Sequence, residues 1–297
     1  MKKFQIVIPI LNQHDATEES VQSWIDLAKD KIDILFIDNG SEVPLESTDF
    51  YRRWEDAGHV RCIRNDQNVG VYPTFQQGLE NTDADFIFYS HNDVEMLEYG
   101  WDVKLGRLLG SSDSSWGVGG MFGAQGLGLP GIYQQPYHMH QLQRWGCVTV
   151  EGMHDPSSAR AIRFEKERVM VLDGFSLIVS RAMIKTAMQG RFHHEDFPPH
   201  HMYDIDICIT SHYAGFSNYC LDIDCIHKGG RTSTTEKWAE VMGTTDEEVH
   251  REAHHVFYEK WRGMLPVAVM PDGEPMTQQM ITGYWQSLIE AHSKRVR

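Results

Sequence analysis

An α/β fold with a mainly parallel central sheet flanked by helices is predicted by two features of the first part of the chain. Short apolar segments have the length and composition of buried strands, and stretches with helical periodicity lie between them. The strands are expected at residues 4–10, 32–38, 60–64 and 85–90, and the helices at 18–30 and 70–82. Strands that alternate with helices in this way form parallel sheets with right-handed crossovers.

The rest of the chain continues this pattern with less regular spacing. We expect strands at 116–123 and 168–180, and helices from Trp101 to Leu109 and at 181–189, 203–216 and 247–261. Residues 123–146 are rich in Gly, Pro, Gln and aromatic residues without a clear period, which indicates a long loop or lid. Because no repeat or linker interrupts the chain, we predict one domain over 1–235 and a helical C-terminal extension, 236–297, packed on the same domain.

The composition favours a globular protein and argues against several classes of partner. The 297 residues are 41% hydrophobic, which is enough for a large core, and they carry a formal net charge of -15. Nucleic acid is a disfavoured partner, because attraction to it requires the opposite charge or a concentrated basic face. No apolar run approaches the roughly 18–20 residues that span a bilayer, and the N-terminal segment indicates a strand instead of a signal peptide or an anchor.

The number and spacing of the cysteines indicate a reducing compartment. The chain has 5 of them, scattered and without a CxxC pair, so they indicate neither a disulfide framework nor a zinc-thiolate site. A reducing cytoplasm is the expected location. The oligomeric state is not predicted by the sequence.

Polar residues follow the predicted strands where each one ends. Asn12 follows the first strand, DNGS (38–41) follows the second, and Asn92 and Asp93 follow the fourth. Ligands of open parallel sheets bind at the carboxyl ends of the strands, where helix N-termini also point. A carboxylate there, such as Asp93, suits a Mg²⁺ or Mn²⁺ ion that holds phosphate oxygens, although an Asp in this position can equally cap the following helix.

Seven segments in a fixed order resemble one known family. They are IVIPILN (6–12), IDILFIDNGS (32–41), NVGVYPTFQQGL (68–79), DFIFYSHNDVEM (85–96), LDGFSLIVSRAMI (172–184), YDIDICITSHYAGF (203–216) and IHKGG (226–230). Together they resemble the inverting glycosyltransferases of the GT-A fold, specifically glycosyltransferase family 2. The resemblance covers about residues 4–235, or to about 262 with the next helix. It implies a Rossmann-like nucleotide-diphospho-sugar transferase with a nucleoside-diphosphate sugar donor, and it does not name the sugar.

The resemblance assigns a metal site and a donor site to particular residues. Asp93 matches the last Asp of the family's metal-binding motif, with His91 in place of the usual first Asp or Asn. His227 resembles a histidine that often completes the metal shell, although an isolated His more often has a structural role. The implied cofactor is Mn²⁺ or Mg²⁺. Asp38 resembles the carboxylate that hydrogen-bonds the nucleotide base, and the donor-binding residues expected with it are Pro9, Asn12, Asn68, Gly70 and Asn92.

The same matching places the catalytic base at the start of the helix expected at 203–216. The family has a Glu-Asp-x-Asp-like pattern there, and YDID (203–206) resembles it with Asp204 as the base and Tyr203 where Glu is common. Asp206 is the second candidate for the base, or it caps the helix or holds the acceptor. An acceptor hydroxyl must lose its proton as it attacks the anomeric carbon, and a positioned carboxylate contributes about 10²–10⁴ in rate.

Three further residues are expected to contact substrate. Asp173 and Gly174 resemble a strand that faces the sugar in the family, although a strand-end Asp without a ligand is nearly as good an interpretation. His201 precedes the predicted base by three residues. These three complete the predicted acceptor side of the site.

The histidines ahead of the base admit two interpretations. HHEDFPPHHMYDID (193–206) contains His193, His194, His200 and His201, which suggests a metal site. Tetrahedral zinc requires three or four converging ligands, however, and this spacing matches no compact zinc pattern. We therefore favour a loop that lines the acceptor or donor site.

The leading hypothesis is a divalent-metal-dependent inverting glycosyltransferase that acts on a glycan or another hydroxyl acceptor, as in polysaccharide biosynthesis. One alternative is a catalytically degenerate protein that binds a nucleotide sugar or a glycan. Another is a histidine-rich metallohydrolase with tightly bound zinc.

Overall fold

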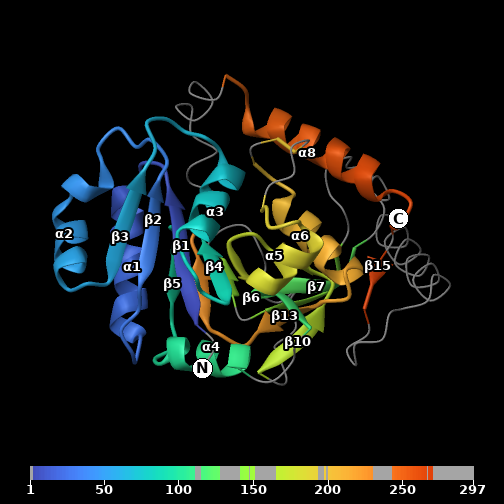
Figure 1. Cartoon of the computed structure of the whole chain (residues 1–297), viewed down its shortest axis with the longest axis horizontal. Coiled ribbons are helices and arrows are strands. Elements are labelled where there is room, and N and C mark those ends of the chain that lie inside the picture. The colour runs from blue at the N-terminus through green and yellow to red at the C-terminus, as the bar shows by residue number, and fades with distance from the viewer. Residues whose placement is uncertain are drawn as a thin grey trace, which may run out of the picture.

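A central sheet with helices on both faces organises the chain, as the sequence predicts (Figure 1). The computed structural model describes residues 3–110, 115–127, 141–146, 148–150, 165–192, 197–198, 200–229, 243–265 and 267–269. Within these residues the main sheet has 8 strands in the order β10-β13-β6-β12-β4-β1-β2-β3. No described helix is both long enough and apolar enough to cross a lipid bilayer.

The first half of the sheet is parallel, which confirms the expected β-α-β units. Its strands are β1 (Phe4–Ile10), β2 (Ile34–Asp38), β3 (Val60–Arg64) and β4 (Phe86–Ser90). β1 lies between β2 and β4, and β3 flanks β2, all with parallel pairing. The connecting helices include α1 (His14–Leu27) and α3 (Val71–Glu80). β2 and β4 are buried along their whole length, as strands of a sheet covered on both faces must be.

The second half of the sheet mixes directions. β12 (Ser176–Ser180) runs antiparallel to β4 on one side and to β6 (Trp116–Gly120) on the other. β13 (Ser217–Leu221) is parallel to β6, and β10 (Lys166–Val169) closes the edge antiparallel to β13. Because β12 runs antiparallel to β4, the first residue of β12 and the segment before it lie at the carboxyl end of β4.

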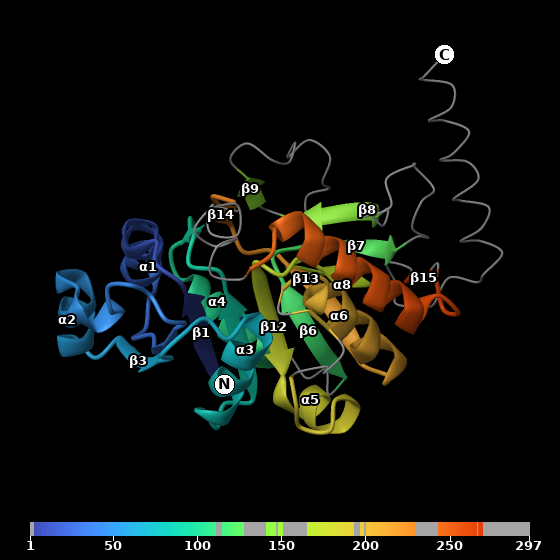
Figure 2. The ribbon, with the colours of Figure 1, turned by 90° about the horizontal axis from the view of Figure 1, so that it is seen from above.

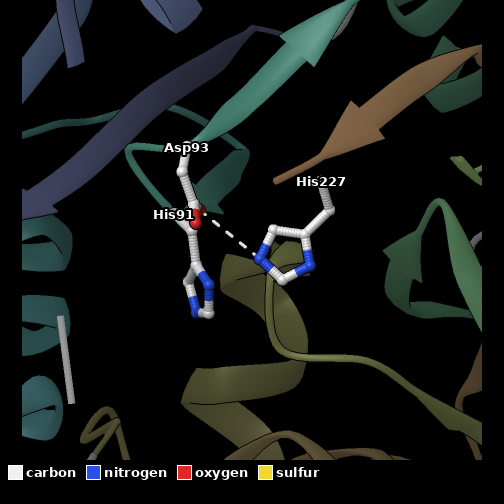
Figure 3. A group of neighbouring side chains, drawn as sticks. All are labelled: His91, Asp93 and His227. Carbon is white, nitrogen blue, oxygen red and sulfur yellow. Dashed lines mark ion pairs between the residues drawn. The ribbon is translucent and has the colours of Figure 1, made fainter. Parts of the chain in front are cut away.

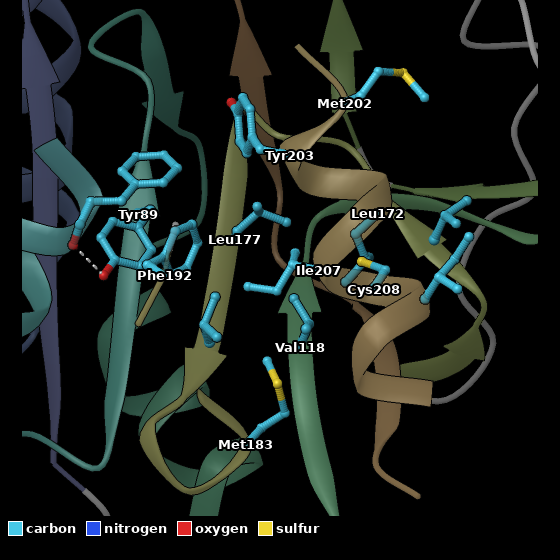
Figure 4. Close-up of a cluster of buried hydrophobic side chains, with 14 of the residues drawn as sticks. Tyr89, Val118, Leu172, Leu177, Met183, Phe192, Met202, Tyr203, Ile207 and Cys208 are labelled. Atoms are coloured by element: carbon cyan, nitrogen blue, oxygen red, sulfur yellow. Dashed lines mark hydrogen bonds between the residues drawn. The ribbon is translucent and has the colours of Figure 1, made fainter. Parts of the chain in front are cut away.

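Alternation along the strands divides the core into two layers, because successive strand side chains point to opposite faces. Ile6 and Ile8 of β1 pack with α1, α2 (Asp49–Asp56) and α4 (Trp101–Gly110). Val7 packs on the other face with α3, α5 (Arg181–Ala187) and α6 (Tyr203–Tyr213). Figure 4 shows this second layer, in which Ile207 of α6 faces Leu177 of β12.

The helix of the C-terminal extension, α8 (Asp246–Trp261), lies beside α6 in both views (Figures 1 and 2). Its Ala253, Phe257 and Trp261 belong to the same buried cluster as Tyr203 and Ile207. A capping box of Thr245 and Glu248 begins the helix, and β15 (Val267–Ala268) follows it. The predicted boundary at 235 falls outside the described residues, so the division into 1–235 and 236–297 stays a prediction.

The prediction of a loop over 123–146 is wrong at both ends of this range, where the chain forms strands. β7 (Phe122–Leu127) and β8 (Gln141–Gly146) pair antiparallel, and β7 also pairs with β11 (Val171–Leu172) and β15. The glycines of this region allow strands to approach closely: a Cβ at Gly123 would lie 2.5 Å from the carbonyl oxygen of Val171. Residues 128–140 lie outside the described part.

Other expected boundaries also need correction. The strand at 116–123 is two strands that separate at Met121, and the segment at 168–180 is divided into β10, β11 and β12. α1 begins at His14 and ends at Leu27, earlier than the expected 18–30. α2 and the short helix η1 (Leu45–Ser47) were not expected, although Thr48 caps α2 by accepting a hydrogen bond from the backbone N–H of Tyr51.

Candidate active site

The carboxyl ends of β1, β2 and β4 lie at one edge of the sheet, because the three strands are adjacent and parallel. Ile10 is in register with Asp38, and β4 pairs with the other side of β1. The residues that follow these strands, among them Asn12 and Asp93, therefore come to the same edge. This is the edge at which the sequence predicts a ligand.

A second small sheet brings His227, which is distant from Asp93 in the sequence, to this edge. β5 (Val94–Met96) pairs antiparallel with β14 (Cys225–His227), with Val94 opposite His227, and β14 also pairs with β9 (Val148–Val150). His227 therefore lies next to Asp93, as Figure 3 shows. One ligand atom of each of His91, Asp93 and His227 lies within 4.8 Å of the others.

These three residues fit a divalent cation. Asp93 Oδ1 and His227 Nε2 are 3.4 Å apart, and each is a buried atom without a hydrogen-bond partner. Burial alone would raise the pKa of Asp93, but the neighbouring His227 and His91 rings outweigh it and hold that pKa below its usual value. A buried polar atom without a partner is costly, and a cation between the carboxylate and the imidazole would satisfy both atoms.

His91 contacts Tyr203, the first residue of α6. The Tyr203 hydroxyl donates to the carbonyl oxygen of Gly174 at 3.3 Å and lies 3.2 Å from His91 Nε2. If the hydroxyl directs its single proton to Gly174, it can accept from the Nε2–H tautomer of His91, and the lone pair of the ring is then on Nδ1. Burial, followed by the neighbouring His227, lowers the pKa of His91, which favours the neutral ring that a metal ligand requires. Hydrogen bonds of this kind orient histidine ligands of metals.

Asp204 lies in the first turn of α6, where its carboxylate is held by two backbone N–H groups. Oδ2 accepts from Gly174 and Oδ1 from Ile205, both at 2.8 Å. Burial, and then the negative charge of Asp173, raise the pKa of Asp204 to about 7, although both hydrogen bonds act in the opposite direction. A carboxylate with a pKa near the working pH is suited to general base catalysis.

Gly174 is required by the close approach of Tyr203. A Cβ at this position would lie 2.5 Å from the Tyr203 hydroxyl oxygen, which is closer than van der Waals contact allows. Asp173 accepts a hydrogen bond from the backbone N–H of Phe175 at 3.2 Å, and Phe175 stacks on the His227 ring. The segment at 173–175 therefore connects the cluster of His91, Asp93 and His227 to the predicted base.

Asp206 has a different environment from Asp204. It is 5% exposed, and it is bound to α8 by Lys260 Nζ at 2.8 Å and by Trp261 Nε1 at 2.7 Å. Both carboxylate oxygens accept hydrogen bonds in this arrangement. The geometry therefore favours Asp204 as the base, and it makes Asp206 a residue that positions α8.

We expect Asp206→Ala to destabilise the protein by about 2–3 kcal/mol, because it removes charge-assisted hydrogen bonds from a buried position. The free energy of unfolding in urea measures this loss. Asp83→Ala is the matched control, because Asp83 forms an exposed ion pair with Lys3, and its unfolding midpoint should not change. Equal midpoints for the two variants would show that Asp206 does not anchor α8.

Asp38 holds the loop that follows β2. Its carboxylate accepts the backbone N–H groups of Ser41 at 2.9 Å and Leu45 at 3.0 Å, and it pairs with Arg64 at the end of β3. Burial alone would raise the pKa of Asp38, but these hydrogen bonds and the Arg64 charge keep it below its usual value. Arg64 was not among the predicted site residues, although it ends β3 as Asp38 ends β2 and is therefore found by the same strand-end rule.

The other residues predicted to bind the nucleotide-sugar donor lie in β1 or in the loops at this edge of the sheet. Asn12 donates its backbone N–H to Ser41 Oγ at 2.8 Å, and Asn92 Nδ2 donates to Thr17 Oγ1 at 2.9 Å. Asn68 Oδ1 accepts from Gly70 N at 2.9 Å and from Asn39 Nδ2 at 2.7 Å. Pro9 lies in β1 in register with Ile37. Asn39, which belongs to the predicted DNGS segment, accepts a hydrogen bond from Asn65, which was not predicted.

His201 lies at the end of the loop before α6 and binds α8. Its Nε2 is 2.8 Å from Asp246 Oδ1. His200 and His201 are close to each other, with ring centroids 4.2 Å apart. His193 and His194 lie outside the described residues.

The fold is the GT-A fold of glycosyltransferases, and part of the chain matches one of their families. Over residues 5–113, from β1 through α4, the chain matches the family Glycosyl transferase family 2. The matched part includes Asp38 and Asp93. No curated protein matches the chain.

Solved structures share the fold at low sequence identity. A mannosyltransferase, PcManGT from Pyrobaculum calidifontis in complex with GDP-Man and Mn²⁺, superposes with a TM-score of 0.53 at 11% identity over 89% of this chain and 70% of its own. GalNAc-T7 with UDP, GalNAc and Mn²⁺ gives 0.58 at 13% identity over 77% and 44%. S. aureus TarS 1-349 gives 0.53 at 12% identity over 88% and 73%. Likeness at these identities establishes the fold alone.

Proposed function

We propose that the protein transfers a sugar from a nucleoside-diphosphate sugar to an acceptor hydroxyl with inversion of the anomeric configuration. The acceptor is a glycan or another hydroxyl compound. The observation that carries this proposal is the position of Asp204: a carboxylate with a pKa of about 7 that is joined through Tyr203 to the cluster of His91, Asp93 and His227.

At the donor end, Asp93 and His227 would hold Mn²⁺ or Mg²⁺, with His91 as a further ligand. A cation held there would supply positive charge to neutralise the departing diphosphate. Structural neighbours in complex with Mn²⁺ and a nucleotide or nucleotide sugar support this assignment. The residues at the edge of the sheet would bind the nucleoside; they are Pro9, Asn12, Asp38, Asn68, Gly70 and Asn92.

At the acceptor end, Asp204 takes the proton of the attacking hydroxyl. The two N–H groups of Gly174 and Ile205 fix the orientation of the carboxylate, so it is aimed before the acceptor arrives. Asp173 and Gly174 would contact the sugar or the acceptor, whereas His201, which was also expected there, is bound to Asp246 of α8. In-line displacement requires the base on the face of the sugar opposite the diphosphate, and base and metal cluster come from different elements here.

The proposal is tested by release of nucleoside diphosphate from a panel of UDP-, GDP- and dTDP-sugars with Mn²⁺, Mg²⁺ or EDTA. We expect slow, metal-dependent hydrolysis of one donor class in the absence of acceptor. Thermal-shift titration with the corresponding nucleoside diphosphates measures binding separately. Metal-dependent binding without release from any donor, with or without candidate acceptors, would instead support a protein that binds nucleotide sugar without turnover.

The rate of transfer should rise with pH through about 7. Asp204 is protonated below its pKa, so it can accept a proton only above it. The pH dependence of nucleotide release at saturating donor measures the midpoint. Asp173→Asn removes the charge that raises this pKa and keeps an acceptor for Phe175 N–H, so the midpoint should move to lower pH. A midpoint that does not move would assign the titration to another group.

A further inference from the structure

A cluster of imidazoles and one carboxylate joins two elements outside the metal cluster of the active site. His200 and His201 come from the loop before α6, and Asp246 comes from the first turn of α8. One ligand atom of each lies within 4.8 Å of the others, and His201 Nε2 is 2.8 Å from Asp246 Oδ1. The cluster shares no residue with His91, Asp93 and His227, the other such group among the described residues.

The face of α8 that contacts the loop carries two more histidines. His250 and His254 follow Asp246 at intervals of four residues, so the three side chains share one face of the helix. The His250 ring lies 4.6 Å from the His201 ring, centre to centre, and His250 Nε2 is 3.1 Å from His254 Nε2. His250 is therefore placed to approach the same point as His201, and His254 is placed to orient it.

Two residues of this loop have backbone conformations that are unfavourable for residues with a side chain. His201 and Met202 have φ values of 68° and 60°, in the left-handed region that residues with a Cβ rarely adopt. Such conformations persist where surrounding contacts hold them, and they concentrate at functional sites. The contacts between His201 and α8 supply part of that restraint.

The donor atoms determine which ion fits. Two or three imidazole nitrogens and one carboxylate oxygen are typical of zinc sites, whereas Mg²⁺ and Ca²⁺ prefer oxygen ligands throughout. Asp246 supplies a negative charge at the same point.

We propose that His200, His201 and Asp246, with His250 beside them, form a second metal site that binds Zn²⁺ and fastens α8 to the loop before the catalytic helix. His201 precedes Asp204 by three residues, so an ion here would hold the N-terminal turn of α6 as well as α8. Zinc binding at this site is independent of the proposed transfer reaction, because none of its ligands belongs to the donor metal cluster.

The test uses the full chain without an affinity tag, with the donor metal cluster removed by Asp93→Ala and His227→Ala. In that background we expect one equivalent of Zn²⁺ per chain by elemental analysis. With Co²⁺ in place of Zn²⁺, we expect the visible absorption bands of a tetrahedral ion. Adding His201→Ala should remove both signals and weaken zinc binding by more than the roughly 10- to 100-fold loss that follows removal of an outer partner.

Two more variants separate ligation from folding. Asp246→Asn keeps a hydrogen-bonding group opposite His201 but is a poor ligand, so it should lose zinc while its metal-free melting temperature stays near that of the background. His255→Ala removes an exposed histidine of the same helix and should change neither signal. If the background binds no zinc, or binds it equally after His201→Ala and Asp246→Asn, the cluster is an ion pair with stacked rings and the proposed site is wrong.

Discussion

Asp204→Asn is expected to lower the rate of transfer by about 10²–10⁴-fold while the affinity for the donor stays the same. Asparagine has nearly the same shape and can still accept the backbone N–H of Gly174, but it cannot take a proton from the acceptor. The loss should therefore appear in kcat and not in the Kd of the nucleoside diphosphate. Steady-state kinetics and calorimetric titration of the same preparation measure the two quantities.

The matched control for this substitution is Asp224→Asn, because Asp224 is an exposed carboxylate outside the site. Its kinetics should equal those of the wild type. A second comparison is Asp206→Asn, in which the effect should fall on stability more than on rate, because Asp206 is bound to Lys260 and Trp261. A rate loss as large for Asp206→Asn as for Asp204→Asn, in a folded protein, would move the base to Asp206.

Asp93→Ala is expected to abolish the metal dependence of donor binding. The carboxylate is the anionic member of the cluster with His91 and His227, and a bound cation contributes several kcal/mol to stabilising the leaving group, which corresponds to about two orders of magnitude in rate or more. The measurement is the affinity for nucleoside diphosphate with Mn²⁺ and with EDTA. The wild type should bind much more tightly with Mn²⁺, and the variant should bind equally weakly in both.

Two further variants of this site distinguish its parts. His227→Ala removes a neutral ligand and should weaken Mn²⁺ binding less than Asp93→Ala. Tyr203→Phe removes the hydroxyl that contacts His91 Nε2 and should weaken Mn²⁺ binding without removing any ligand. If Asp93→Ala keeps the Mn²⁺ dependence of the wild type, the metal lies elsewhere.

The parallel half of the fold is predictable from the sequence because its strands are buried on both faces. ILFID in β2 and FIFYS in β4 are nearly continuous apolar segments, and each ends in a polar residue that marks the edge of the sheet. The antiparallel half is not predictable in the same way. Residues 116–127 form two strands of different sheets with glycines at close contacts, and neither helical nor strand periodicity separates them.

The site is also predictable only in part: some residues are identified by short sequence motifs, whereas others are identified only by contacts between residues far apart in the sequence. Asp93, His227 and Asp204 were predicted from short motifs, and the structure brings Asp93 and His227 together through the pairing of β5 with β14. The contact of His201 with Asp246 spans 45 residues of sequence, so no spacing rule could pair them. The same holds for Asp206 and Trp261, 55 residues apart, whose contact gives Asp206 a different environment from Asp204 in the same motif.

Release of nucleoside diphosphate by the wild type and by Asp204→Asn, with the same donor at pH 8 and with Mn²⁺ or EDTA, tests the central claim most directly. Asp204 is ionised at this pH, because its pKa is about 7. The wild type should release the nucleotide only with Mn²⁺, and the variant should bind the donor with equal affinity but release almost none. Equal release by the two proteins, or release that EDTA does not reduce, would contradict a metal-dependent transfer with Asp204 as the base.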